Sequence, residues 1–250
     1  MRRPTIAFAP RAIFSAGICL GLSIVLSSCY FTSVGHWNED SYLAQPYGNW
    51  RTVHVCVYLD EGVSKERALS LMSDWTKPDG AAHYYHMDVV PVGFWTLPRE
   101  GFLHSTIMNE VAHIPLKEQC DRLFYFAKRS VADYVYANAP AILLGVFPPE
   151  VLGEVDDATM THGFAFAGPD SVLSALDGPQ HTTGHELYHL LGSCPHAWTL
   201  KKCYARISML KRMPSTDGMY PSMNLAGNQI FTSRALVNKV MASYSDPLMP

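Results

Sequence analysis

Alternating apolar positions predict a set of short strands. From Thr52 to Leu59, Val53, Val55 and Val57 fall on one face, and a period of two is typical of a strand. Other short apolar runs end at proline or glycine, as buried strands do. We therefore expect further strands within residues 83–95, 141–147, 161–167 and 171–176.

Apolar positions spaced three to four residues apart predict helices. Ser64 is suited to cap the first of them, and Gly192 is suited to end the third. The helices are expected over residues 64–75, 117–137, 182–191 and 233–244. Residues 193–232 are rich in proline, methionine and serine, which indicates an irregular segment.

The order of these elements indicates an α/β fold with a mixed sheet, followed by a small irregular lobe that closes with a helix. Apolar residues make up 48% of the chain, which is enough for a sizeable core, and 16% charged residues are too few for a disordered chain. The length of 250 residues allows one domain or a close pair of lobes. We place the domain at residues 51–250, with lobes at 51–192 and 193–250.

The first 28 residues have the layout of an export signal. Three arginines precede an apolar run from Ile13 to Leu26. The run ends in Leu26-Ser27-Ser28-Cys29, which resembles the bacterial lipobox. That resemblance implies cleavage before Cys29 and attachment of lipid to it, with residues 29–50 as a tether. The alternatives are an ordinary signal peptide with a chance cysteine, or an uncleaved anchor.

A lipid on Cys29 would anchor the protein to a membrane of the bacterial cell envelope. Tyr30 follows it, where an aspartate would favour the inner membrane, so the outer membrane is favoured. The net charge of −3 argues against a nucleic-acid partner. The sequence contains neither a phosphate-binding glycine loop nor a dinucleotide fingerprint, so no nucleotide cofactor is expected.

Four cysteines remain once the signal has left and lipid has taken Cys29. An even number in an oxidising compartment predicts disulfides. Short spacing favours Cys194–Cys203, which leaves Cys56–Cys120. Free buried thiols or soft metal ligands are the alternative, although no Cys-x-x-Cys spacing supports a thiolate zinc site.

The strongest chemical signal is His185-Glu186-Leu187-Tyr188-His189. Residues four apart lie on one face of a helix, so His185 and His189 can bind one Zn²⁺ ion through their imidazoles. Glu186 lies beside them and can act as general base on a water molecule and then as proton donor to the leaving amine. The motif therefore predicts metal-assisted hydrolysis.

A catalytic zinc site uses three protein ligands and one open position. His196 is the favoured third ligand, because a left-handed turn at Gly192 can bring it back under the metal. A loop histidine on the surface is the alternative for His196. His181 lies four residues before His185, and we expect it to be exposed at the helix start.

These residues resemble the metzincin zinc peptidases, and in particular their reprolysin-like branch. The pattern is His185-Glu186-x-x-His189-x-x-Gly192 followed by a histidine, which here comes one residue later than usual because Pro195 takes that place. The resemblance covers about residues 141–240. It implies a zincin-like mixed sheet with packed helices, an active-site helix and a small C-terminal lobe with a final helix.

The resemblance also assigns two further segments. Residues 163–167 look like the metzincin edge strand, which pairs with an extended substrate. The substrate-binding residues would then be Gly163, Phe164, Ala165 and Phe166. Residues 218–222 look like the Met-turn beneath the metal, with Met219 as the favoured methionine and Met209 and Met223 as rivals.

Together these features predict an exported, lipid-anchored zinc endopeptidase that hydrolyses peptide bonds through a water activated by Glu186 and one catalytic Zn²⁺, with peptides or proteins as substrates. Asp156 and Asp157 could bind calcium, although a solvated acidic turn is favoured. The rival function is a non-catalytic surface lipoprotein, a binding or assembly module with a structural or vestigial zinc site. A fourth protein ligand at the metal would favour that rival.

Overall fold

The computed structural model describes most of the chain from residue 49 onward. The described residues are 49–78, 80–99, 104–133, 135, 151–168, 179–194, 200–214 and 217–247. The signal peptide, Cys29, nearly all of the tether, His196 and the strands expected over 141–147 and 171–176 lie outside them.

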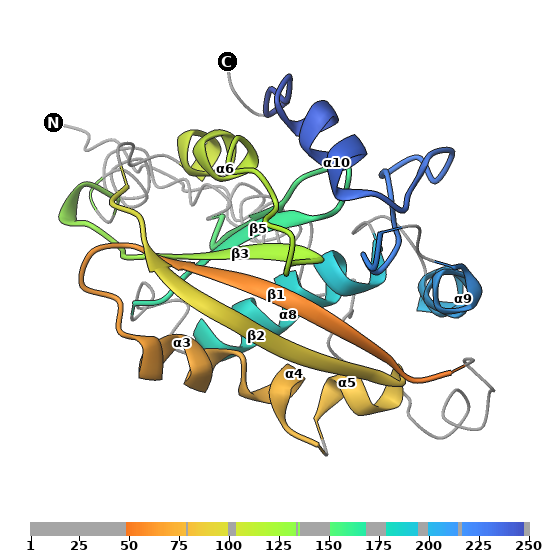
Figure 1. Cartoon of the computed structure of the whole chain (residues 1–250). Coiled ribbons are helices and arrows are strands. Elements are labelled where there is room, and N and C mark those ends of the chain that lie inside the picture. The colour runs from red at the N-terminus through yellow and green to blue at the C-terminus, as the bar shows by residue number, and fades with distance from the viewer. Residues whose placement is uncertain are drawn as a thin grey trace, which may run out of the picture.

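Five strands form a mostly parallel sheet in this part of the chain, in the order β2-β1-β3-β5-β4 (Figure 1). Neighbouring strands run parallel except β4, which runs antiparallel to β5 at one edge. The strands are β1 (Arg51–Leu59), β2 (Met87–Thr96), β3 (Arg122–Ala127), β4 (Gly153–Val155) and β5 (His162–Phe166). The expected mixed α/β architecture is confirmed at this level.

Helices cover both faces of the sheet (Figure 1). Apolar residues of α3, α4, α8 and α9 join one core cluster, and those of α6 and α10 join the other. The helices are α3 (Lys65–Leu71), α4 (Ser73–Thr76), α5 (Ala81–Tyr84), α6 (His104–Ala112), α8 (Pro179–Gly192), α9 (Leu200–Arg212) and α10 (Arg234–Met241). Strands β6 (Ser222–Met223) and β7 (Ile230–Phe231) form a small antiparallel pair.

The local signals for β1, β5, α3 and α10 are confirmed. Val53, Val55 and Val57 are fully buried in one cluster, as their alternation predicts. Ser64 caps α3 by accepting from the Arg67 N–H, and Ser233 caps α10 in the same way.

The helix expected over residues 117–137 is wrong, because β3 occupies its centre. Every residue of β3 is buried, since the sheet is covered on both faces. A strand buried on both faces is a continuous apolar run, and periodicity alone does not distinguish it from a helix. Val131 and Val135, which the expected stripe placed inside, are exposed.

Two other expectations need correction. Residues 193–232 are not irregular throughout, because they contain α9 and the pair β6–β7. The strand expected over 83–95 begins only at Met87, after the short helix α5.

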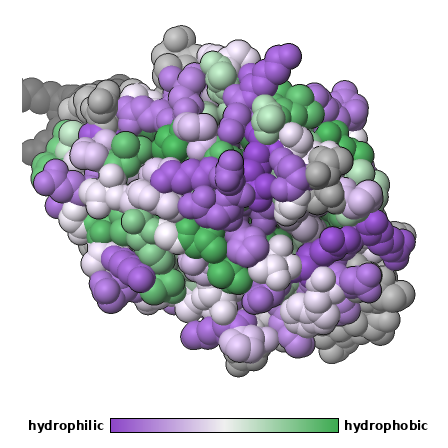
Figure 2. Space-filling model, viewed as in Figure 1, coloured by the Kyte–Doolittle hydropathy of each residue, from purple (hydrophilic) through white to green (hydrophobic). Residues whose placement is uncertain are grey.

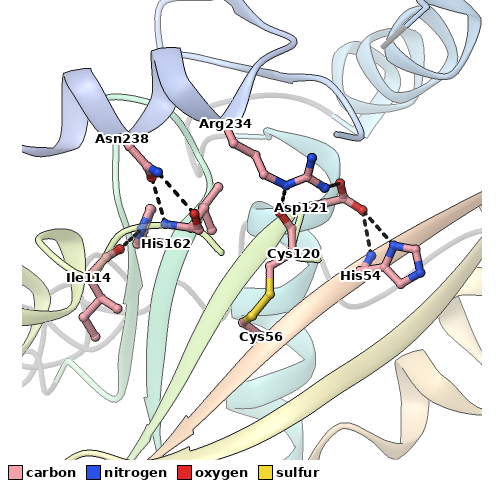
Figure 3. Close-up of a disulfide and its surroundings, with 9 residues drawn as sticks. His54, Cys56, Ile114, Cys120, Asp121, His162, Arg234 and Asn238 are labelled. Atoms are coloured by element: carbon pink, nitrogen blue, oxygen red, sulfur yellow. Dashed lines mark hydrogen bonds and ion pairs between the residues drawn. A yellow bond between two sulfur atoms is a disulfide. The ribbon is translucent and has the colours of Figure 1, made fainter. Parts of the chain in front are cut away.

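Both expected disulfides are confirmed. Cys56–Cys120 joins the middle of β1 to the residues that lead into β3 (Figure 3). Cys194–Cys203 joins the end of α8 to α9. On the face of the molecule shown in Figure 2, polar residues lie across the centre and hydrophobic side chains form separate small groups around them.

Candidate metal centre

Helix α8 carries the histidine motif and is held firmly against the sheet. It begins three residues earlier than expected, with Pro179 at its first position, where proline is well tolerated. Leu187, Leu190 and Leu191 are fully buried in the core. The Trp75 indole N–H also donates to the Gly184 carbonyl at 2.9 Å, one residue before His185.

The two imidazoles of the motif converge. The Nε2 atoms of His185 and His189 lie 3.0 Å apart, with the rings nearly perpendicular. Zinc–nitrogen bonds of 2.0–2.1 Å at near-tetrahedral angles place two ligand nitrogens about 3.0–3.4 Å apart. The observed separation therefore fits two ligands of one metal ion.

The tautomer of His189 is set by its second nitrogen. Nδ1 is hydrogen-bonded to the main-chain carbonyl of Cys194. A carbonyl only accepts, so Nδ1 carries the hydrogen and Nε2 keeps its lone pair for a metal. Because Cys194 is disulfide-bonded to Cys203, the disulfide helps to fix the carbonyl that orients this histidine.

Glu186 directly follows His185 on α8 and is buried, with 4% of its surface exposed. Its Oε2 atom has no hydrogen-bond partner among the described residues. Loss of hydration raises the pKa of this carboxyl group to about 8. A carboxyl group that exchanges its proton near neutral pH is suited to general acid–base chemistry.

A glycine of the edge strand makes room for this carboxylate. A Cβ atom on Gly153 would lie 2.5 Å from the Glu186 Cγ and 2.8 Å from the Phe164 carbonyl oxygen. Glu186 therefore packs directly against the backbone of β4. Gly153 was not predictable from the sequence, because a three-residue strand has no usable periodicity, and a glycine in a strand signals close approach only once the strand is known.

The expected edge strand is a different one. Gly163, Phe164, Ala165 and Phe166 belong to β5, which pairs with β3 on one side and β4 on the other. All four are buried and β5 is an inner strand, so the expected place of these residues at a sheet edge is wrong. The edge beside α8 is β4.

The methionines are also distributed differently from the expectation. Met219 is fully buried in the cluster with Phe231 and Val237. Met223 instead shares a cluster with Leu187 and other residues of α8. Met209 is exposed on α9. Of these three methionines, Met223 is therefore the one that shares a core cluster with the histidine helix.

Asp156 binds main-chain N–H groups in the interior of the fold, a role that was not among those considered from the sequence, a calcium site and a solvated acidic turn. It is fully buried, and its two carboxylate oxygens accept main-chain N–H bonds from four residues, Thr159 to His162. His162 is also buried, and its Nε2 lies 2.8 Å from the Ile114 carbonyl oxygen (Figure 3). His181 is exposed in the first turn of α8, as expected.

Within the described ranges, no group of three or more His, Cys, Asp or Glu residues could hold a metal ion. His196, the expected third ligand, lies outside the described residues. In those ranges no helix is long and apolar enough to cross a bilayer. Comparison of the chain with protein-family models, with curated proteins and with solved structures finds no match.

Proposed function

We propose that this protein is a zinc-dependent endopeptidase. The observation that carries the proposal is the convergence of the His185 and His189 Nε2 atoms at 3.0 Å next to the buried Glu186, whose Oε2 lacks a described partner.

His185 and His189, with His196 as third ligand, would hold the ion. Zinc supplies Lewis-acid polarisation of a carbonyl group and of water when it is bound. Glu186 accepts a proton from the attacking water at a carboxylate oxygen and returns it to the leaving amine nitrogen. The pKa of about 8 suits both directions of this transfer near neutral pH.

Strand β4 supplies the surface for an extended substrate. It pairs with β5 along one edge, and its other edge pairs with no described strand. A peptide that added to this edge would receive main-chain hydrogen bonds and pass close to Glu186, which packs on Gly153. Residues 153–155 thus take the place first given to 163–166.

Export and lipid attachment at Cys29 are part of the same proposal, with the outer membrane favoured. The two disulfides support export, because structural disulfides persist in oxidising compartments and are rare in the cytosol.

Zinc content and proteolysis test this function. We expect the purified protein without its signal segment to contain about one zinc per chain and to cleave casein in a chelator-sensitive manner. Glu186→Gln should keep the zinc and lose nearly all cleavage, because its side chain cannot accept the proton. Glu118→Gln, on the exposed surface, is the matched control and should cleave like the wild type. Zinc without any casein cleavage by the wild type would favour the non-catalytic lipoprotein.

A further inference from the structure

A fully buried arginine links the histidine helix to the segment that follows α9. Arg122 is the first residue of β3 and has no exposed surface. Taking a guanidinium group out of water is costly unless its N–H groups find acceptors in good geometry. The way these donors are used therefore indicates what the residue is for.

All four acceptors of Arg122 are main-chain carbonyls. Nε donates to Leu190 at 3.0 Å, and one terminal nitrogen donates to Asp121 at 2.8 Å and to Tyr220 at 3.0 Å. The other terminal nitrogen donates to Pro221 at 3.0 Å. One planar group thus joins α8, β3 and the segment 220–221.

Arg122 contacts α8 at a carbonyl group near the C-terminus of the helix. Helix α8 ends at Gly192, so the Leu190 carbonyl is one of the last four and has no acceptor role within the helix. A cation at a helix C-terminus also interacts favourably with the helix dipole. Leu190 directly follows His189, so this bond fixes the turn that carries the second histidine.

The segment 220–221 is hydrogen-bonded to two adjacent residues, Asp121 and Arg122. The Tyr220 carbonyl accepts from Arg122, and the Tyr220 N–H donates to Asp121 Oδ1 at 2.9 Å. Asp121 is itself held by the His54 N–H and by Arg234, next to the Cys56–Cys120 disulfide (Figure 3). Tyr220 shares its core cluster with Leu190 and Leu191 of α8. The backbone beside Arg122 is therefore held in place at Asp121, and so is Tyr220, the residue that Arg122 binds in the segment 220–221.

We infer that Arg122 is a positioning residue for the metal centre, which holds the last turn of α8, and with it His189, against the segment 220–221. This inference rests on the proposed function, because it assumes that His189 binds zinc. Lysine could not replace it, since a single ammonium group lacks the planar set of donors that reaches three segments.

The test compares Arg122→Lys with Arg99→Lys. Arg99 is also largely buried, with 7% of its side chain exposed, but it pairs with Asp60 and Asp133, and no bond from it to α8 is found among the described residues. For each variant we would measure the melting temperature, zinc affinity by chelator competition, and the visible spectrum of the Co²⁺-substituted protein. Arg122→Lys should weaken zinc binding, by less than the about 10–100-fold that follows loss of a group bonded directly to a metal ligand, because Arg122 holds the neighbouring Leu190 carbonyl; it should also alter the Co²⁺ spectrum. Arg99→Lys should lower the melting temperature and leave both metal measurements unchanged.

Equal zinc affinity and identical Co²⁺ spectra in Arg122→Lys and the wild type would overturn the inference. A wild type that binds no zinc would overturn the proposed function as well. A wild type that binds zinc without hydrolysing peptides would overturn the proposed function alone, because neither metal measurement depends on cleavage.

A second measurement needs no variant to fold. Coupling between two sites is reciprocal, so zinc bound to His189 must also stabilise the hydrogen bonds that Arg122 donates to Leu190 and to the segment 220–221. Hydrogen exchange of the Arg122 Nε–H, followed by NMR in the wild type, should slow at least tenfold when zinc is added. Equal exchange rates with and without zinc would overturn the inference.

Discussion

Gly153→Ala tests the packing between the edge strand and the candidate general base. The new Cβ would lie 2.5 Å from the Glu186 Cγ, 3.1 Å from its Cδ and 2.8 Å from the Phe164 carbonyl oxygen. The carbonyl belongs to β5 and cannot move without disturbing the pairing with β4. The Glu186 side chain must therefore shift to make room for the new Cβ atom.

The expected loss of stability is about 1–3 kcal/mol, the usual range for overpacking. For a domain of this size that corresponds to a melting temperature lower by about 3–10 °C. Displacement of Glu186 should also lower kcat at least about tenfold, because a positioned general base contributes about 10²–10⁴ in rate. Zinc content should not change, since neither His185 nor His189 is among the atoms closest to the new Cβ.

Calorimetry, zinc analysis and peptide-cleavage kinetics would measure these effects. Gly184→Ala is the matched control, because its Cβ would meet nothing closer than 3.8 Å and it lies inside α8. That control should stabilise the protein by about 0.5–1 kcal/mol, since alanine is the better helix former. A Gly153→Ala variant with wild-type melting temperature and kcat would refute the packing described here.

Three further perturbations separate the remaining claims. Burial, with nearby acidic groups, raises the pKa of Glu154 to about 8, so the free-energy cost of burying this residue grows from about pH 4.5 to pH 8. The free energy of unfolding of Glu154→Gln in urea should therefore equal that of the wild type near pH 4 and exceed it near pH 8. A difference that does not change with pH would contradict this. Removing Cys194–Cys203 by paired serines should cost about 2–3 kcal/mol and weaken zinc binding through the Cys194 carbonyl that orients His189, whereas removing Cys56–Cys120 should cost about 4 kcal/mol, because it closes the longer loop. Cys29→Ser should move the protein from the membrane fraction to the soluble one, and an unchanged membrane fraction would remove the lipid anchor.

Elements with a clear period or cap were predictable from the sequence. The valines of β1 alternate because they line one face of that strand, which lies in the core cluster that also contains α8, and Ser64 and Ser233 mark helix starts by their capping chemistry. The two disulfides followed from cysteine number and spacing.

Features that depend on tertiary surroundings were not predictable. Strand β3 is buried on both faces and carries no alternation, so its apolar run was mistaken for a helix. Strand β4 has three residues, too few for any pattern. Arg122 could not be recognised as buried, because arginine is usually exposed and its acceptors lie up to 99 residues away.

Glu186 is the acidic residue of α8, and its Oε2 atom has no hydrogen-bond partner among the described residues. Gly184 accepts from Trp75, Leu190 accepts from Arg122, and His189 is held by Cys194. A buried carboxylate oxygen without a described partner is costly, and natural proteins keep such groups where activity depends on them.

Zinc-free Glu186→Gln should therefore melt at a higher temperature than the zinc-free wild type at pH 7, because the neutral amide is easier to bury than a carboxyl group that must give up its charge. The same variant should lose hydrolysis, so stability and activity would change in opposite directions. Differential scanning calorimetry of the two zinc-free proteins measures the first effect. A lower melting temperature for Glu186→Gln would mean that the carboxylate stabilises the fold through contacts of its own, and the argument that it is retained for catalysis would then fail.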